Sequence, residues 1–369
     1  MFLTDIPQHR LFNQQIAETK FTTAAKMISW MCAIQAQEYS QTKWSLGLRL
    51  SNLKDNDIEK DFTNGKILRT HLLRPTWHFV TAKDIRWLLM LTGPRVTAAN
   101  MHMYRKLELD AKIFNRCNNI IVNTLQGGRQ LTRNMLNNEF KKYKITATDI
   151  RLSCIMMNAE LQGIICSGAR EGNQFTYALL EERVPATVVK NKDEALAELT
   201  KRYFRSRGPA TIKDYSIWSG LTVSDCRNGI EMVRSYFVRE KLNNEEYFFA
   251  PVALNKISHD MHLLPIYDEY IMGYKNRSAI LEFKNNLKKT PVFHFDNMII
   301  FEGQVIGTWR RIIHQKHIDL EYNFFKTLNK VEFTLFKNAS IAFERFTGLK
   351  VNLREVKKSS ILSRIGFAK

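Results

Sequence analysis

One order of elements recurs along this chain and limits what it can fold into. Two helices and a longer third helix are followed by two β-rich runs around a turn. The order is clearest mid-chain, where 114–128, 131–143 and 146–163 show helical patterns and Thr132 is placed to cap the second helix. Residues 164–180 then predict a hairpin. Three helices followed by a hairpin are typical of a winged helix.

The same order appears twice more. In residues 193–254, two threonines each precede an aspartate by three positions, as in a capping box, and Asn243-Asn244 predicts a hairpin turn. The first hundred residues fit more loosely, with a helix at 23–33 and a hairpin at 65–80. The sequence therefore predicts three tandem winged-helix units.

From about residue 262 onward the pattern changes to β-rich runs, including 290–312 and 328–336, with one helix at 339–349. Even strand spacing around turns predicts a small barrel or a strongly curved sheet. The expected fold class is α+β, with three tandem winged-helix units followed by a C-terminal β-rich, barrel-like domain. The domain boundaries that we predict are 1–105, 106–190, 191–258 and 259–369.

The charge balance indicates what the chain binds. Its 369 residues include 55 Lys and Arg against 36 Asp and Glu, a formal net charge of +19. Such an excess favours polyanions, with nucleic acid ahead of an anionic membrane surface. No stretch reaches the ~18 apolar residues of a membrane span, and residues 1–15 lack the layout of a secretory signal. The 5 cysteines are scattered without a C-x-x-C pair, which predicts a reducing cytoplasm.

Two pairs of histidines, His259/His262 and His314/His317, have the H-x-x-H spacing of some metal ligands. Neither pair has cysteines nearby or the H-E-x-x-H context of zinc enzymes. We therefore expect ordinary surface or packed histidines, and we expect no metal and no other cofactor.

The segment "AIQAQ" places Gln35 and Gln37 one residue apart among apolar neighbours. A glutamine amide is a poor proton shuttle, so the pair calls for a role other than acid or base. If the helix at 23–33 continued through them, their side chains would point about 200° apart. In an extended chain the two side chains would emerge on the same face. A shared role therefore predicts that the helix ends near Ile34.

Several fragments, taken together and in this order, resemble one known family. They are "AIQAQ", "LRPTWHFVTAKDIRWLL", "RGPATIKDYSIWSGL", "LLPIYDEYIMGYKNRS" and "GQVIGTWRR". The chain resembles a winged-helix DNA-binding family whose characterised members are DNA glycosylases that unhook interstrand crosslinks. Within that family it is most similar to the azinomycin-resistance, AlkZ-like branch. The resemblance covers essentially the whole chain.

The resemblance implies that Gln35 and Gln37 form the catalytic motif, because members of this branch carry a Gln-x-Gln pair. A sister branch has Asp at the second position. The chain departs from the family at Pro75 and Trp77, where Gly and Leu are expected. These two residues lie in the hairpin beside the catalytic segment, so the departure puts the range of lesions in question.

The chemistry of the implied reaction suits a pair of amides. Alkylation of guanine at N7 places a positive charge on the base and makes it a good leaving group. Little acid catalysis is then needed, and the remaining task is to position a water against the developing sugar cation. A neutral amide can accept one hydrogen bond from water and donate others. The implied activity is that of a monofunctional glycosylase acting on N7-alkylguanine, with interstrand crosslinks among its substrates.

We expect phosphate contacts from basic residues at helix starts, at hairpin turns and on the C-terminal β-rich part. These are Arg69, Arg74, Arg129, Arg133, Arg170, Arg205, Arg207, Lys275, Arg277, Arg310 and Arg311. Asp268 and Glu269 are the fallback source of a general base, although pairing with neighbouring arginines is the more ordinary role for such carboxylates.

A competing hypothesis is a non-enzymatic winged-helix transcriptional regulator that binds a palindrome as a dimer. Three units in one chain already give a long footprint, which favours a monomer on double-stranded, damaged DNA. We therefore expect a cytoplasmic monomer with DNA as its partner, no membrane association and no obligate protein partner.

Overall fold

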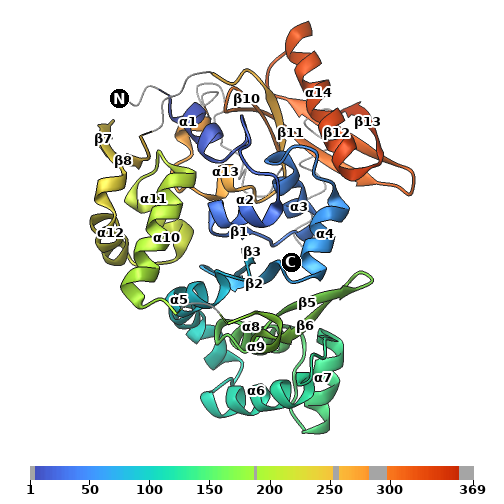
Figure 1. Ribbon diagram of the computed structural model, residues 1–369. Coiled ribbons are helices and arrows are strands. Elements are labelled where there is room, and N and C mark those ends of the chain that lie inside the picture. Colours follow the sequence, from blue (N-terminus) through green and yellow to red (C-terminus); the bar gives the residue numbers. More distant parts are fainter. Residues whose placement is uncertain (1–4, 187–188, 252–256, 282–296, 357–369) are drawn as a thin grey trace.

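The computed structural model describes residues 5–186, 189–251, 257–281 and 297–356 (Figure 1). Helices and sheets are mixed along the chain, as the α+β class requires. In Figure 1, α6 and α7 lie at one end of the molecule, the C-terminal sheet with α14 lies at the other, and β1–β3 lie between them. No helix in these described ranges has both the length and the apolar character of a membrane-crossing segment.

The N-terminal part combines helices with a three-stranded sheet in the order β1-β3-β2. Its elements are α1 Ile6–Asn13, α2 Ala24–Met31, β1 Ile34–Gln35, α3 Tyr39–Leu48, α4 Asp55–Thr63, β2 Ile67–Leu72, β3 Thr76–Thr81 and α5 Ile85–Lys106. The Thr23 hydroxyl caps the start of α2, and Cys32 ends the helix with a φ of 66°. The predicted end of the helix ahead of Gln35 is confirmed.

The second part contains the helices and the hairpin that the sequence predicts. Its elements are α6 Ala111–Leu125, β4 Leu131–Thr132, α7 Arg133–Lys142, α8 Asp149–Leu161, β5 Ile165–Glu171, β6 Gln174–Leu179 and α9 Leu180–Arg183. Thr132 caps α7 by accepting a hydrogen bond from the Met135 backbone N–H, as expected. The strands form a sheet in the order β4-β6-β5.

The third part repeats the same order. Its elements are α10 Lys192–Arg207, α11 Ile212–Ser219, α12 Val223–Met232, the 3-10 turn η1 Arg234–Tyr236, β7 Val238–Leu242 and β8 Glu245–Phe249. Thr211 and Thr222 cap α11 and α12. Asn243 and Asn244 have φ values of 49° and 63°, the left-handed conformation of a tight hairpin turn, so the predicted turn is confirmed.

The C-terminal part is an open five-stranded sheet in the order β13-β12-β11-β10-β9. Its elements are β9 Met261–Leu264, α13 Glu269–Met272, η2 Ser278–Ile280, β10 Asn297–Phe301, β11 Gln304–Ile313, β12 His317–Phe324, α14 Lys330–Thr347 and β13 Lys350–Glu355. Within the described residues the prediction of a barrel is wrong. Strands β12 and β13 are parallel and are joined through helix α14, and the outer strands β13 and β9 do not pair with each other.

Helix α14 also corrects the prediction of a β run at 328–336. Asn329 and Glu332 form a capping box that starts the helix well before the predicted 339–349. Phe336 and Phe343, both fully buried, then lie on the face that packs against the sheet. In the other predicted run, residues 290–296 lie outside the described residues.

The N-terminal and C-terminal parts share one hydrophobic core. Trp44 on α3 packs edge-on against Phe343 of α14, with ring centroids 4.9 Å apart. Its indole N–H also donates to the Leu263 carbonyl of β9 at 2.7 Å. Ile34 of β1 belongs to the same cluster of buried side chains. The segment that carries the two glutamines is therefore fixed by packing from both ends of the chain.

Candidate active site

Strand β1 places Gln35 on the edge of the N-terminal sheet. It pairs antiparallel with β3, with Gln35 opposite His78, and the Ala36 N–H donates to the Trp77 carbonyl at 2.7 Å. Gln35 is 5% exposed, whereas Gln37 lies two residues beyond, in a bend, and is partly exposed. The extended geometry expected of the pair thus covers Gln35 and ends just before Gln37.

Gln35 is held at three points. Its side-chain Oε1 accepts a hydrogen bond from Arg74 Nη2 at 3.0 Å. Its backbone N–H donates to Glu269 Oε1 at 2.8 Å, and its carbonyl accepts from Thr42 Oγ1 at 3.0 Å. Because Oε1 faces Arg74, the amide presents its NH₂ end as the remaining hydrogen-bonding group.

Gln37 differs from Gln35 in that its acceptor is free. Among the described residues, no hydrogen-bond partner contacts its buried Oε1 atom. Its backbone carbonyl accepts from Arg69 Nη2 at 3.4 Å, and Arg69 Nε donates to the Ala36 carbonyl at 2.9 Å. A buried carbonyl oxygen without a protein partner costs free energy, so this atom is suited to accept a hydrogen bond from water or substrate.

Trp77, one of the two departures from the family pattern, supports this arrangement. The Arg69 guanidinium lies over the Trp77 ring at 4.2 Å and over the Phe175 ring at 4.5 Å. Arg69 is only 9% exposed, and its guanidinium is surrounded by these two rings and by the backbone carbonyls of Ala36 and Gln37. The tryptophan therefore helps to hold the segment that carries the glutamines.

A row of buried polar side chains crosses the sheet beside Gln35. His78 lies opposite Gln35 on one side and opposite Thr70 on the other. His78 Nδ1 lies 3.0 Å from the Thr76 carbonyl, which can only accept, so Nδ1 carries the proton and Nε2 is an acceptor. Burial and, to a lesser extent, Arg74 hold the pKa of His78 well below its ordinary value of 6.5. The imidazole is therefore neutral.

Asp268 and Glu269 are fully buried in ion pairs. Asp268 accepts from Arg49 Nη2 at 2.7 Å and Nη1 at 2.8 Å. Burial would raise the pKa of Asp268, but Arg49 outweighs it and the pKa is lowered. Glu269 Oε2 accepts from Arg207 Nη2 at 2.7 Å and from Trp218 Nε1 at 2.9 Å. The expected pairing with arginines is confirmed, and the structure offers no support for a general base here.

Arg207 is 0% exposed and cannot reach a phosphate, so we withdraw it from the predicted DNA contacts. Besides Glu269 it binds the chain leading into β1, donating to the Met31 carbonyl at 2.7 Å and to the Ala33 carbonyl at 2.8 Å. Nothing local in the sequence indicated a partner so far along the chain.

The other predicted phosphate contacts differ in their exposure and in whether they already have a protein partner. Arg129, Arg205 and Lys275 are exposed. The remaining basic residues are partly or largely buried and have a protein partner: Arg69, Arg74, Arg133 with Ser153, Arg170 with Glu59, Arg277 with Ile271, Arg310 with Glu321 and Arg311 with Ser40. Exposed arginines and lysines remain the best predicted phosphate contacts.

The two histidine pairs have different surroundings. Donor atoms of His314, His317 and Asp319 lie within 4.8 Å of one another at the β11–β12 turn, a cluster that could hold a metal ion. Asp319 also forms an ion pair with Arg354 at 3.1 Å, and this cation would oppose a metal. His259 forms a pair with Glu302.

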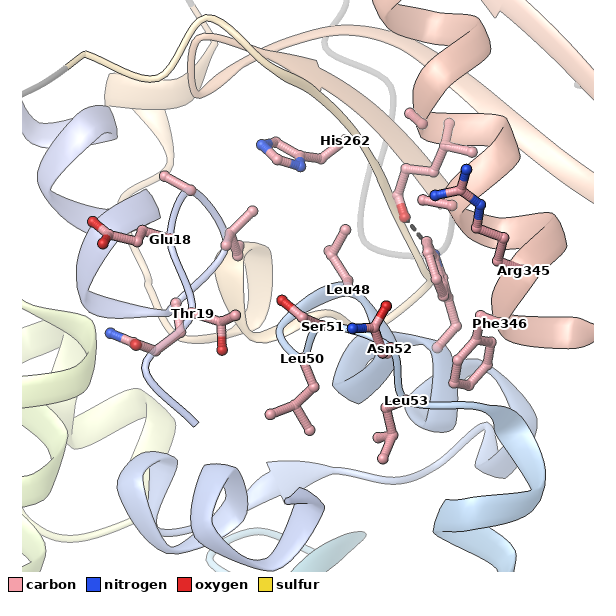
Figure 2. Close-up of a pocket in the computed structure, with 18 of the residues that line it drawn as sticks. Glu18, Thr19, Leu48, Leu50, Ser51, Asn52, Leu53, His262, Arg345 and Phe346 are labelled. Carbon is pink, nitrogen blue, oxygen red and sulfur yellow. Dashed lines mark hydrogen bonds between the residues drawn. The ribbon is translucent and has the colours of Figure 1, made fainter. Parts of the chain in front are cut away.

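A pocket of about 870 Å³ lies between the loop after α3 and helix α14 (Figure 2). Its lining includes Glu18, His262 and Arg345. Burial lowers the pKa of His262 to about 4. Neither Gln35 nor Gln37 lines this pocket, so the candidate active site is not this cavity.

The comparisons with known proteins agree on one family. A family profile described as "DNA glycosylase AlkZ-like" matches residues 28–336. An interstrand DNA cross-link repair glycosylase of Streptomyces sahachiroi is 21% identical over 318 residues, covering 78% of this chain and 82% of that protein. The solved structure of Streptomyces sahachiroi DNA glycosylase AlkZ has a TM-score of 0.77 at 17% identity, covering 95% of this chain and 98% of that one. The structural likeness shows a shared fold, and the profile match, which spans most of the sequence, shows that the chain belongs to the AlkZ-like DNA glycosylase family.

Proposed function

We propose that this protein hydrolyses the N-glycosidic bond of N7-alkylated guanine in double-stranded DNA, interstrand crosslinks included, with Gln35 and Gln37 positioning the attacking water. The observation that carries the proposal is the arrangement of the two amides. Gln35 has its oxygen turned to Arg74, whereas Gln37 Oε1 has no partner among the described residues. One glutamine thus keeps its donor end available, and the other keeps its acceptor available.

The proposed step needs no protein acid. The bonding pair of the C1′–N9 bond leaves with the alkylated base, which becomes neutral as it departs. Water forms the new C1′–O bond, and its proton passes to solvent. The two amides contribute by holding that water in the productive orientation, an effect worth several kcal/mol in well-oriented reactions. A monofunctional glycosylase of this kind leaves an abasic site.

The proposed DNA-binding mode uses three winged-helix units in one chain. Three helices followed by a hairpin occur at α6–α8 with β5 and β6, and again at α10–α12 with β7 and β8. Such units track phosphates over a long footprint, which suits a lesion tied to both strands that cannot swing fully out of the duplex. A monomer suffices for this footprint.

We expect duplex binding to depend steeply on salt. With about 6–10 phosphate contacts, affinity should fall roughly 10³–10⁵-fold between about 50 and 200 mM salt. Fluorescence anisotropy over a salt series measures this slope. Lys275→Ala, which removes an exposed cation, should reduce the slope by about one. A slope near zero would contradict the proposed phosphate contacts.

The rate of base release should not vary with pH between about 6.5 and 9. Neither amide titrates in this range. The pKa of His78 is lowered, so its imidazole loses any charge well below the range and stays neutral throughout it. Single-turnover rates over a pH series test this expectation. A tenfold rise per pH unit would indicate a titrating base and contradict the assignment to glutamines.

The function itself is tested by incubating the protein with duplex DNA that contains N7-methylguanine and measuring the free base by mass spectrometry. Release of the intact alkylated base, with the DNA strand left unbroken, is the expected result. Tight binding without release, both from this duplex and from one carrying an N7–N7 crosslink, would favour the competing hypothesis of a winged-helix regulator.

A further inference from the structure

Arg74 occupies the tight turn between β2 and β3. The turn is closed by backbone hydrogen bonds of 2.6 Å from Arg74 N–H to the Leu72 carbonyl and from Thr76 N–H to the Arg74 carbonyl. Gly220, which ends helix α11, packs directly against it, because a Cβ at this position would lie 2.2 Å from the Leu73 carbonyl oxygen. The position of Arg74 is therefore fixed by both its own strands and a neighbouring helix.

The Arg74 side chain reaches from this turn to the first glutamine. Nη2 donates to Gln35 Oε1 at 3.0 Å, and Nη1 donates to the Ile217 carbonyl at 3.4 Å. A guanidinium has donors only, so it can accept nothing from an amide NH₂. Only one of the two possible orientations of the Gln35 amide is compatible with this contact.

We propose that Arg74 is a positioning residue that fixes the Gln35 amide with its NH₂ toward the reacting water, so that Gln35 donates to the water while Gln37 Oε1 accepts from it. This inference rests on the proposed glycosylase function and gives the two glutamines different roles. Without Arg74, the Gln35 amide could rotate and present its oxygen. Both amides would then only accept hydrogens from the water, and the donor that fixes the orientation of its oxygen would be lost.

The sequence had suggested a different role for Arg74, as a phosphate contact, and the two roles give opposite results. A positioning residue changes the rate at saturating enzyme, whereas a phosphate contact changes the dissociation constant and its salt slope. Arg74→Ala should lower the single-turnover rate of base release about 10- to 100-fold. Its dissociation constant for the same duplex should stay within about threefold of wild type. Arg105→Ala, which removes an exposed arginine on α5, is the matched control for loss of one cation and should keep the wild-type rate at saturating enzyme.

A double-mutant cycle separates positioning from a general structural effect. If Arg74 acts through Gln35, adding Arg74→Ala to Gln35→Ala should cause no further loss of rate. An equal loss in both backgrounds would overturn the inference, as would a weaker dissociation constant with an unchanged saturating rate. Gln35→Glu supplies an independent check, because it keeps the acceptor that Arg74 binds and removes the NH₂. It should lose as much activity as Gln35→Ala.

The contact can also be tested without catalysis, so that its failure is distinct from failure of the proposed function. In ¹⁵N-labelled protein, the Gln35 side-chain NH₂ signals are assigned by their disappearance in Gln35→Ala. They should shift in Arg74→Lys, because the planar donor pair is replaced by a single ammonium. Unchanged signals would overturn the positioning role. A wild-type protein that binds DNA but releases no base would instead overturn the glycosylase proposal.

Discussion

Arg207→Met is expected to lower the free energy of unfolding by about 3–5 kcal/mol, because it leaves a buried carboxylate without its partner. Arg207 and Glu269 are both 0% exposed and lie 2.7 Å apart. The same guanidinium binds the Met31 and Ala33 carbonyls, which would also lose their donor. Urea denaturation followed by circular dichroism measures the loss.

Arg205→Ala is a matched control for this substitution, because Arg205 is exposed on the same helix. Its guanidinium lies over the face of Trp30, at 4.6 Å, so its removal should cost no more than about 1 kcal/mol. Adding Glu269→Gln to Arg207→Met removes both charges and should recover part of the stability. Equal stability of Arg207→Met and wild type would contradict the role assigned to the pair.

Gln37→Ala is expected to reduce the saturating rate of base release by at least about 100-fold while leaving duplex binding within about threefold. The substitution removes a buried side-chain acceptor that no described residue uses. Single-turnover kinetics and fluorescence anisotropy on the same duplex separate the rate from the affinity.

Gln37→Glu provides the sharper comparison, because a carboxylate keeps an acceptor at the same position. It should retain much more activity than Gln37→Ala. If Gln37→Ala kept the wild-type rate, the glutamine would be part of the scaffold only. The water would then have to be positioned by another group, of which neutral His78 is the nearest candidate by strand register to Gln35.

The sequence predicted local features well because their causes are local. The glutamine spacing required an extended chain, and α2 ends at Met31, before Gln35. Caps at Thr132, Thr211 and Thr222 each need only a side-chain oxygen and a nearby backbone N–H. The family resemblance added the role of the pair, which no local pattern contains.

Features set by distant contacts were not predictable. Arg207 and Glu269 are 62 residues apart in sequence, and their pairing depends on how α10 and α13 meet. Arg74 was predicted to bind phosphate, although its partner lies 39 residues earlier. The barrel prediction failed because residues 328–336, rich in β-favouring side chains, begin α14 instead. The two arginine partners depend on which elements meet in the folded chain, and a single sequence does not report that.

The most direct test of the central claim uses an end-labelled duplex that carries one N7-alkylguanine. Wild type and Gln37→Ala are incubated side by side, the DNA is treated with mild alkali, and strand breaks are mapped. We expect a break at the alkylated base with wild type that is lost in Gln37→Ala, while both proteins bind the duplex equally. A break of equal strength with both proteins would contradict the assignment of the chemistry to the glutamine pair.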